Sequence, residues 1–382
     1  MNAVDAARQI VGRAIAGRVF PAATIDVGTS GGSLWQDALG TLTFDLASAP
    51  TALDTPFDLA SLTKVIATTT ILMELVRTGR VRLDDRVSTC FEEWRGADRE
   101  MVTVRDLLEH ASGLAARLVD APPQGPQGRR EFEHEICRMQ LEYRPRTQSV
   151  YSDLDFILLG FLAADRGAAS LAALFDRIVH DARLKPDATS DTTNERTGAV
   201  SGFSRTGDRH IAPLTFGLAP DAKRRAAPTL PLADDPRRGR SLTGEVQDNY
   251  AAALGGAAGH AGLFGTAQAV AAFARIVLGA ARGERDGPPP FSPALVTLFT
   301  TRSDVPASSR ALGWDTMLPT SSCGTRMSSV AFGHVGFTGT SLWIDPRRDR
   351  YFVLLTNRTC GGGSLDDIRT VRRAFHDALG DF

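Results

Sequence analysis

Ser61-Leu62-Thr63-Lys64 opens an apolar run, residues 65–76 (VIATTTILMELV), whose composition predicts a buried helix. Because residues three positions apart share one helical face, the Lys64 amine is expected to reach the Ser61 hydroxyl. A serine becomes nucleophilic when a neighbour removes its proton, and burial in an apolar site lowers the pKa of a lysine so that its free amine can do this. At the start of the helix, the Ser61 N–H would also face an anion that forms beside the hydroxyl. The stretch thus predicts a nucleophile, a base and half of an oxyanion hole within one helical turn.

The same Ser-x-x-Lys spacing also fits a helix N-cap followed by a surface lysine. The dozen mostly apolar residues after Lys64 favour a buried position instead. The chain also contains a tyrosine and a histidine in contexts that suit the other parts of an activated-serine site.

The composition is that of a globular protein without an unusual charge. The chain has 382 residues, which favours two domains, and a formal net charge of −1, so we expect no nucleic acid or membrane partner. The four cysteines are widely spaced and the seven histidines form no i, i+4 pair, so we expect no disulfide framework and no metal site. The N-terminus lacks an apolar signal segment and no stretch of 18 apolar residues occurs, so a cytoplasmic location is expected.

Residue patterning predicts strands near both ends of the chain and mostly helices between them. Strand-like segments occupy residues 23–28, 33–40, 328–334, 340–344 and 351–356, and helical spacing marks, among others, residues 4–19, 153–166, 266–281 and 364–380. The economical arrangement is one five-stranded antiparallel sheet with the terminal helices packed on it. We therefore predict an α/β (α+β) fold.

This layout also predicts two lobes. An α/β lobe would combine residues 1–75 with residues 250–382, and a mostly helical, loop-rich lobe of residues 76–249 would be inserted into it. A cleft between two such lobes is the expected active site.

Two residues elsewhere in the chain are candidate members of the site. Tyr151 precedes a strongly apolar helical run, residues 154–164, where it is either a core residue or a second proton carrier. A phenol has a pKa of ~10, and the cations Lys64 and a charged His334 would lower it. His334 lies on a predicted strand, where a histidine is commonly structural, but the nearby Gly336 would let a substrate approach the strand backbone. An N–H of that strand can be the second oxyanion donor.

Ser61-x-x-Lys64, Tyr151-Ser152-Asp153 and His334-x-Gly336 occur in the order and rough spacing of the serine β-lactamase and penicillin-binding-protein superfamily, which the chain resembles. The resemblance is strongest to the class C-like branch of β-lactamase-related serine hydrolases. It covers nearly the whole chain and extends to four supporting segments, residues 57–60, 107–114, 258–264 and 333–340. It implies a β-lactamase/transpeptidase-like fold with an inserted helical lobe, and no cofactor.

The resemblance implies a role for each matching residue. Ser61 would be the acylated nucleophile, Lys64 its base and Tyr151 a proton shuttle. The N–H groups of Ser61 and Phe337 would form the oxyanion hole. His334 would stand where the family usually has the lysine of a Lys-Thr-Gly motif.

Three departures from the family pattern bear on the substrate. Asp153 stands where the family commonly has asparagine, so an amide donor is lost, and the acid is placed to pair with Lys64 and keep it charged. The residue after His334 is valine, which lacks a threonine hydroxyl that helps to hold a substrate carboxylate. His334 itself is mostly neutral at pH 7 unless its pKa is raised. We expect His334, Gly336 and Asp153, with Phe337, to line a site for substrates without an obligatory carboxylate.

The sequence therefore predicts a serine hydrolase that acts through an acyl-enzyme on a small ester, lactone or amide. A D-Ala-D-Ala carboxypeptidase or weak β-lactamase, and an acyltransferase, remain alternatives, and a non-catalytic binding protein is disfavoured because serine, lysine and tyrosine occur together. No Gly-x-Ser-x-Gly or P-loop motif points to an α/β-hydrolase or a nucleotide enzyme. His110 and His260 read as structural, and the oligomeric state stays open.

Overall fold

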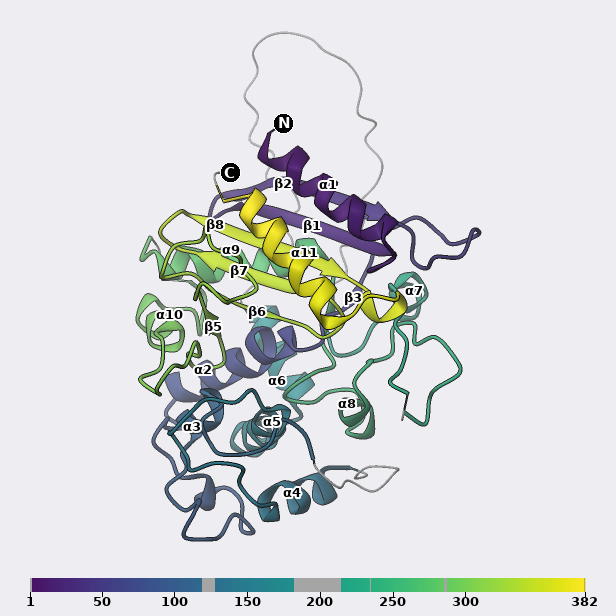
Figure 1. Cartoon of the computed structure of the whole chain (residues 1–382). Helices are drawn as coiled ribbons and strands as arrows, with labels where there is room; N and C mark the ends of the chain where they lie inside the picture. Colours follow the sequence, from purple (N-terminus) through teal and green to yellow (C-terminus); the bar gives the residue numbers. More distant parts are fainter. Residues whose placement is uncertain (1, 119–127, 182–213, 234, 285–286, 381) are drawn as a thin grey trace.

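The computed structural model describes residues 2–118, 128–181, 214–233, 235–284, 287–380 and 382. A six-stranded antiparallel sheet, ordered β2-β1-β8-β7-β6-β5, lies in the upper half of the molecule in Figure 1. Its strands are β1 (Ala22–Thr29), β2 (Gly32–Gly40), β5 (Asp315–Thr316), β6 (Phe332–Val335), β7 (Ser341–Asp345) and β8 (Arg350–Thr356). The prediction of five strands is one short, because the two-residue β5 leaves no alternation to recognise.

Helices from distant parts of the chain cover the two faces of the sheet. They are α1 (Ala3–Ala16), α11 (Leu365–Ala378) and α9 (Ala267–Ala281). α1 and α11 pack on each other and cover the face that is turned to the viewer in Figure 1, and α9 contacts β1, β7 and β8 from behind. Side chains alternate along β8, so that Phe352 and Leu354 join the core under α1 and α11, whereas Val353 joins the larger core that includes α9.

A mainly helical half lies below the sheet in Figure 1. The other described elements are α2 (Thr70–Arg77), α3 (Val104–Leu108), α4 (Gly128–Arg138), α5 (Asp153–Gly167), α6 (Leu171–Asp181), α7 (Pro220–Arg225), α8 (Asn249–Ala253), α10 (Pro293–Thr300), three short helical turns and the strand pair β3 (Phe57–Asp58) and β4 (Phe264–Gly265). None of the helices in the described ranges can by itself cross a membrane; α5 and α6 have the required apolar length only as a pair bent by 70°. The expected lobe boundaries near residues 75 and 250 stay a prediction.

The predicted helix after Ser61 begins in a wider form than expected. Residues Lys64–Thr69 form a π-helical segment that continues directly into α2. All six of these residues are buried, which agrees with the apolar run in the sequence. Wide turns of this kind are uncommon in helices and occur frequently at functional sites.

Two hydrogen bonds fasten the β6–β7 connection to the segment that carries Ser61. The Thr338 hydroxyl donates to the Asp58 carbonyl (2.8 Å), and the Thr340 hydroxyl donates to the Leu59 carbonyl (2.9 Å). The connection is therefore held beside the start of the Ser61 helix, which brings together two segments that are far apart in the chain.

Candidate active site

Ser61 and Lys64 face each other as their spacing predicts. The Lys64 amine donates to the Ser61 hydroxyl over 3.1 Å, and the Lys64 side chain is fully buried. The turn that leads into the helix is held by Asp58, whose carboxylate accepts from the N–H of Ala60 (2.8 Å). Ala60 has a φ of +47°, a conformation that non-glycine residues seldom adopt, so this turn presents Ser61 at a small cost in backbone strain.

Tyr151 reaches Ser61 from the segment just before α5. Its hydroxyl lies 2.7 Å from the Ser61 Oγ, and its ring lies 4.9 Å from the His110 ring between centroids. The next residue, Ser152, caps α5 by accepting from Leu154 N–H and donates its own N–H to His110 Nδ1 (3.1 Å). The cap and the histidine therefore fix the backbone that carries Tyr151. This agrees with the structural role expected for His110.

Asp153 forms a buried ion pair with Lys64. Its Oδ1 lies 2.8 Å from the Lys64 Nζ, and its Oδ2 accepts from Arg117 over 3.0 Å. Burial by itself would lower the pKa of Lys64, but the Asp153 carboxylate and the Tyr151 hydroxyl together raise it above its usual value. Although burial disfavours its charged form, the pKa of Asp153 is lowered because Lys64, His260 and Arg117 surround it. The expectation that an apolar site frees the Lys64 amine is therefore wrong for the resting protein, whereas the pairing with Asp153 is as expected.

Arg117, Asp248 and His260 extend this charged network. The sequence does not point to Arg117 or Asp248, and it assigns His260 a structural part only. Arg117 donates to Asp248 (2.9 Å) as well as to Asp153, and His260 Nε2 lies 2.7 Å from the Asp248 Oδ1. Asp153, Asp248 and His260 have ligand atoms close enough for a metal ion. However, the Arg117 guanidinium bridges the two carboxylates, so the set does not fit a metal cation. No local motif marks Arg117 or Asp248, because they meet the other residues only through folding.

His334 is buried beside Tyr151, with 5.9 Å between the ring centroids. Its Nδ1 donates to the Val335 carbonyl (2.9 Å), while its buried Nε2 has no partner in the described structure. Burial and the cations Arg310 and Lys64 hold the pKa of His334 well below its ordinary value. The idea that a charged His334 lowers the pKa of Tyr151 is therefore wrong; burial raises the pKa of Tyr151, although Lys64 opposes that rise.

Gly336 and Phe337 lie on the connection between β6 and β7. A Cβ at Gly336 would come within 2.7 Å of the Leu59 carbonyl, so only glycine allows this close approach to the Ser61 segment. Among the residues that the structure describes, none accepts a hydrogen bond from the N–H of Ser61 or of Phe337. Both donors are therefore available to a ligand. The Phe337 side chain is 39% exposed.

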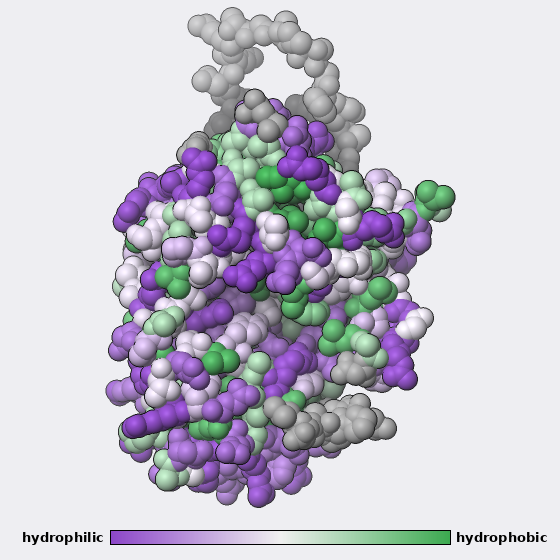
Figure 2. Space-filling view, viewed as in Figure 1, coloured by the Kyte–Doolittle hydropathy of each residue, from purple (hydrophilic) through white to green (hydrophobic). Residues whose placement is uncertain are grey.

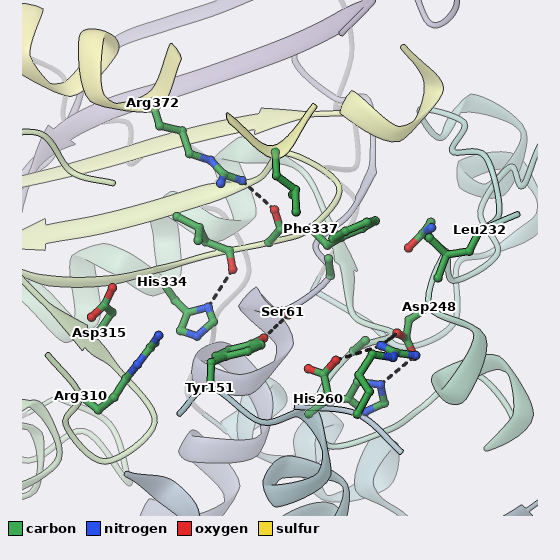
Figure 3. Close-up of a pocket in the computed structure, with 18 residues that line it drawn as sticks. Ser61, Tyr151, Leu232, Asp248, His260, Arg310, Asp315, His334, Phe337 and Arg372 are labelled. Atoms are coloured by element: carbon green, nitrogen blue, oxygen red, sulfur yellow. Dashed lines mark hydrogen bonds and ion pairs between the residues drawn. The ribbon is translucent and has the colours of Figure 1, made fainter. Parts of the chain in front are cut away.

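One cavity of about 440 Å³ is lined by most of these residues, namely Ser61, Tyr151, Asp153, His334, Gly336 and Phe337, with Arg117, Asp248 and His260, and also by Arg310. Figure 3 shows Ser61, Tyr151 and His334 facing it, with Arg310 beside Tyr151 and the Asp248–His260 pair on the far side. The Arg310 guanidinium lies 5.3 Å from the Tyr151 ring centroid and forms no ion pair with a described carboxylate. In Figure 2 the surface is hollowed between the two halves of the molecule. The cavity thus offers a cation that the sequence does not reveal.

Comparisons with known proteins agree with the fold. The sequence model of the family described as Beta-lactamase matches residues 7–376. A protein of Escherichia coli K12 named "Putative D-alanyl-D-alanine carboxypeptidase" is 30% identical over 336 residues, which is 80% of this chain and 69% of that protein.

Two solved structures share the fold. The class C beta lactamase from Rhodobacter sphaeroides has a TM-score of 0.72 and 17% identity, over 98% of each chain. EstCE1, described as a hydrolase with promiscuous acyltransferase activity, has a TM-score of 0.70 and 19% identity, over 97% of this chain and 98% of its own. At these identities the likeness concerns the fold alone, including its helices and antiparallel sheet.

Proposed function

This chain belongs to the beta-lactamase family, and on that basis we propose that it hydrolyses a small ester, lactone or amide through an acyl-enzyme on Ser61. One observation carries the proposal: the Tyr151 hydroxyl and the Lys64 amine lie 2.7 Å and 3.1 Å from the Ser61 Oγ. A serine placed between two proton carriers in a cavity is the arrangement that nucleophilic catalysis requires. The cavity of about 440 Å³ suits a small-molecule substrate.

The resting proton positions determine how Ser61 becomes a nucleophile. Lys64 and Tyr151 both have raised pKa values, so both hold their protons at neutral pH. The reactive form has lost one proton from this pair, which titrates as a unit because the two groups interact closely. Ser61 then gives its proton to the pair while its Oγ attacks the acyl carbon. The pair returns that proton to the leaving group as the tetrahedral intermediate collapses.

The Ser61 and Phe337 N–H groups, which donate to no described residue, would stabilise the charge that develops on the substrate oxygen. The N–H of Ser61 and that of Phe337 belong to segments that the Thr338 and Thr340 hydroxyls hold together. Donors that are fixed in advance favour the transition state, because they need no rearrangement during the reaction. Water that attacks the acyl-enzyme by the same proton route would complete hydrolysis, and an alcohol or amine in its place would give acyl transfer.

A D-Ala-D-Ala carboxypeptidase is the second candidate, and Arg310 favours it. The curated relatives carry this name, and such a substrate ends in a carboxylate. His334 is neutral, but the Arg310 guanidinium in the same cavity, which has no carboxylate partner among the described residues, can bind a carboxylate. Arg310 therefore weakens the argument, drawn from Val335 and His334, that the site lacks a means of holding an anion.

Covalent labelling tests the proposal. Wild-type protein should react with a fluorophosphonate probe or a fluorescent penicillin, and Ser61→Ala should not. Intact-protein mass spectrometry after exposure to esters, lactones, β-lactams and D-Ala-D-Ala peptides would then identify the acyl group. Absence of labelling by every probe, in protein with a normal unfolding transition, would overturn the proposal in favour of a binding protein.

A further inference from the structure

Two buried arginines lie behind the connection that carries the Phe337 N–H. Arg372, on α11, donates through Nη2 to the carbonyls of Gly336 (2.7 Å) and Thr340 (2.8 Å). Arg358 donates to the Phe337 carbonyl (3.1 and 2.7 Å) and to the Gly363 carbonyl (2.8 Å). In the described part of the chain, neither arginine pairs with a carboxylate. The peptide dipoles of this connection therefore provide the compensation that a buried cation requires.

The bond from Arg372 to Gly336 has a specific consequence for the oxyanion hole. The Gly336 carbonyl and the Phe337 N–H belong to the same peptide unit. A cation that accepts electron density from the carbonyl oxygen polarises the whole amide, so its N–H becomes a stronger donor. The carbonyl of Phe337, to which Arg358 donates, belongs instead to the peptide that carries the Thr338 N–H. The two arginines therefore act on adjacent but different peptide units.

We propose that Arg372 is a positioning residue that strengthens and orients the Phe337 N–H as an oxyanion donor. The inference rests on the proposed function, because it assumes that a substrate oxyanion forms beside Ser61. The Arg372 side chain is only 5% exposed, and its Nη2 already serves two carbonyls. Figure 3 shows its guanidinium directed at the backbone of the connection. Although Arg372 borders the cavity, its Nη2 is taken up by the two carbonyls, and this geometry favours action through the peptide.

Arg372 keeps its charge at neutral pH. Burial, together with the repulsion from Arg358, lowers the pKa of Arg372 to about 9. Among the described residues, the buried Nε of Arg372 has no hydrogen-bond partner, so Arg372 leaves one donor unsatisfied in this position. A buried cation with an unsatisfied donor lowers the free energy of unfolding. This cost is expected if Arg372 acts on the site rather than on the stability of the fold.

The experiment compares substrate turnover with the binding of a charged mimic of the intermediate. An arylboronic acid forms a tetrahedral, negatively charged adduct with a reactive serine, and one of its oxygens would occupy the oxyanion hole. For Arg372→Met we expect kcat/KM on a nitrophenyl ester to fall about 10- to 100-fold, less than the loss of a whole oxyanion donor. The boronate dissociation constant should rise by a similar factor, with KM nearly unchanged. Arg372→Lys should recover part of both losses.

Two matched variants separate this role from a structural one. Arg358→Met removes a cation that holds the neighbouring peptide, and we expect less than a threefold change in boronate affinity. Arg99→Met removes another buried arginine that donates to carbonyls, those of Cys137 and Met139, and should lower stability without changing either constant. The proposal would be overturned if the Arg372 and Arg358 variants lost the same factor in boronate affinity and kcat/KM, or if only KM rose.

Arg372→Gln provides a second test if the methionine variant does not fold, because it retains a donor but carries no charge. A folded glutamine variant with wild-type boronate affinity would also overturn the proposal. Failure of the proposed function is distinguishable, since it would appear as an unreactive wild-type Ser61 before any Arg372 variant is compared.

Discussion

The Lys64 amine lies 2.8 Å from the Oδ1 of Asp153, closer than the 3.1 Å that separates it from the Ser61 Oγ. The shortest contact of Lys64 in this site is therefore with the carboxylate of Asp153 rather than with the nucleophile. Because Arg117 holds the other oxygen of Asp153, the carboxylate stays charged and in place. The protonation state of Lys64, and with it the pH range of activity, depends on this pair.

Asp153→Asn should move the pH dependence of acylation to lower pH. Without the carboxylate, burial becomes the main influence on Lys64 and lowers its pKa, so the form that has lost one proton is reached sooner. The measurement is the midpoint of kcat/KM against pH on a neutral ester. Asp248→Asn is the control, because it removes a carboxylate of the same network that does not contact Lys64. An unchanged or higher midpoint in Asp153→Asn would contradict this account.

Lys64→Ala should slow acylation by roughly 10²–10⁴-fold, the usual contribution of a general base. Tyr151→Phe, which removes only the hydroxyl 2.7 Å from Ser61, tests the other member of the pair. Stopped-flow release of nitrophenol measures the acylation step directly. A loss below about tenfold for Lys64→Ala would assign the base role to Tyr151.

Arg310→Met should distinguish charged from neutral substrates. Arg310 has no described carboxylate partner and lies in the cavity beside Tyr151. Its loss should therefore weaken the binding of a substrate with a carboxylate more than the binding of a substrate with an uncharged acyl group. We expect KM for a D-Ala-D-Ala peptide to rise about tenfold, the equivalent of one charge-assisted hydrogen bond, and KM for a neutral ester to change little. Equal effects on both substrates would remove the support that Arg310 lends to a carboxypeptidase.

Gly259→Ala should destabilise the protein and disturb the site. An added Cβ would lie 1.9 Å from the Phe156 carbonyl and 2.9 Å from the backbone of Gly160, so the segment before His260 must move. The His260 carbonyl accepts from Lys64 over 3.2 Å, so the movement reaches the active site. The expected cost in the free energy of unfolding is about 1–3 kcal/mol, measured by urea denaturation.

Gly12→Ala is the matched control for this substitution. Gly12 lies within α1, and a Cβ there would meet nothing within 4 Å. Since alanine is the better helix former, the free energy of unfolding should rise by about 0.5–1 kcal/mol. If the free energy of unfolding changed with the same sign at both glycines, the packing at Gly259 would be looser than the structure indicates.

The regular elements could be predicted closely from the sequence, because their patterns are local. The predicted strands 23–28 and 351–356 correspond to β1 and β8, and the predicted helix 266–281 corresponds to α9. The prediction fails where the pattern is short or unusual. The two-residue β5 has no periodicity, and the π-helical turns at Lys64–Thr69 have the same apolar residues as an ordinary helix.

For the site, the contact between Ser61 and Lys64 follows from their spacing alone, because a helical turn places residues three apart on one face whatever surrounds them. The protonation state of Lys64 depends instead on contacts that folding creates. Its pKa depends on burial and on the distance to Asp153, which lies 89 residues away in the chain. The cations Arg310 and Arg372 likewise reach the cavity from distant segments. Charge interactions act through space and desolvation depends on packing, so neither can be read from local spacing.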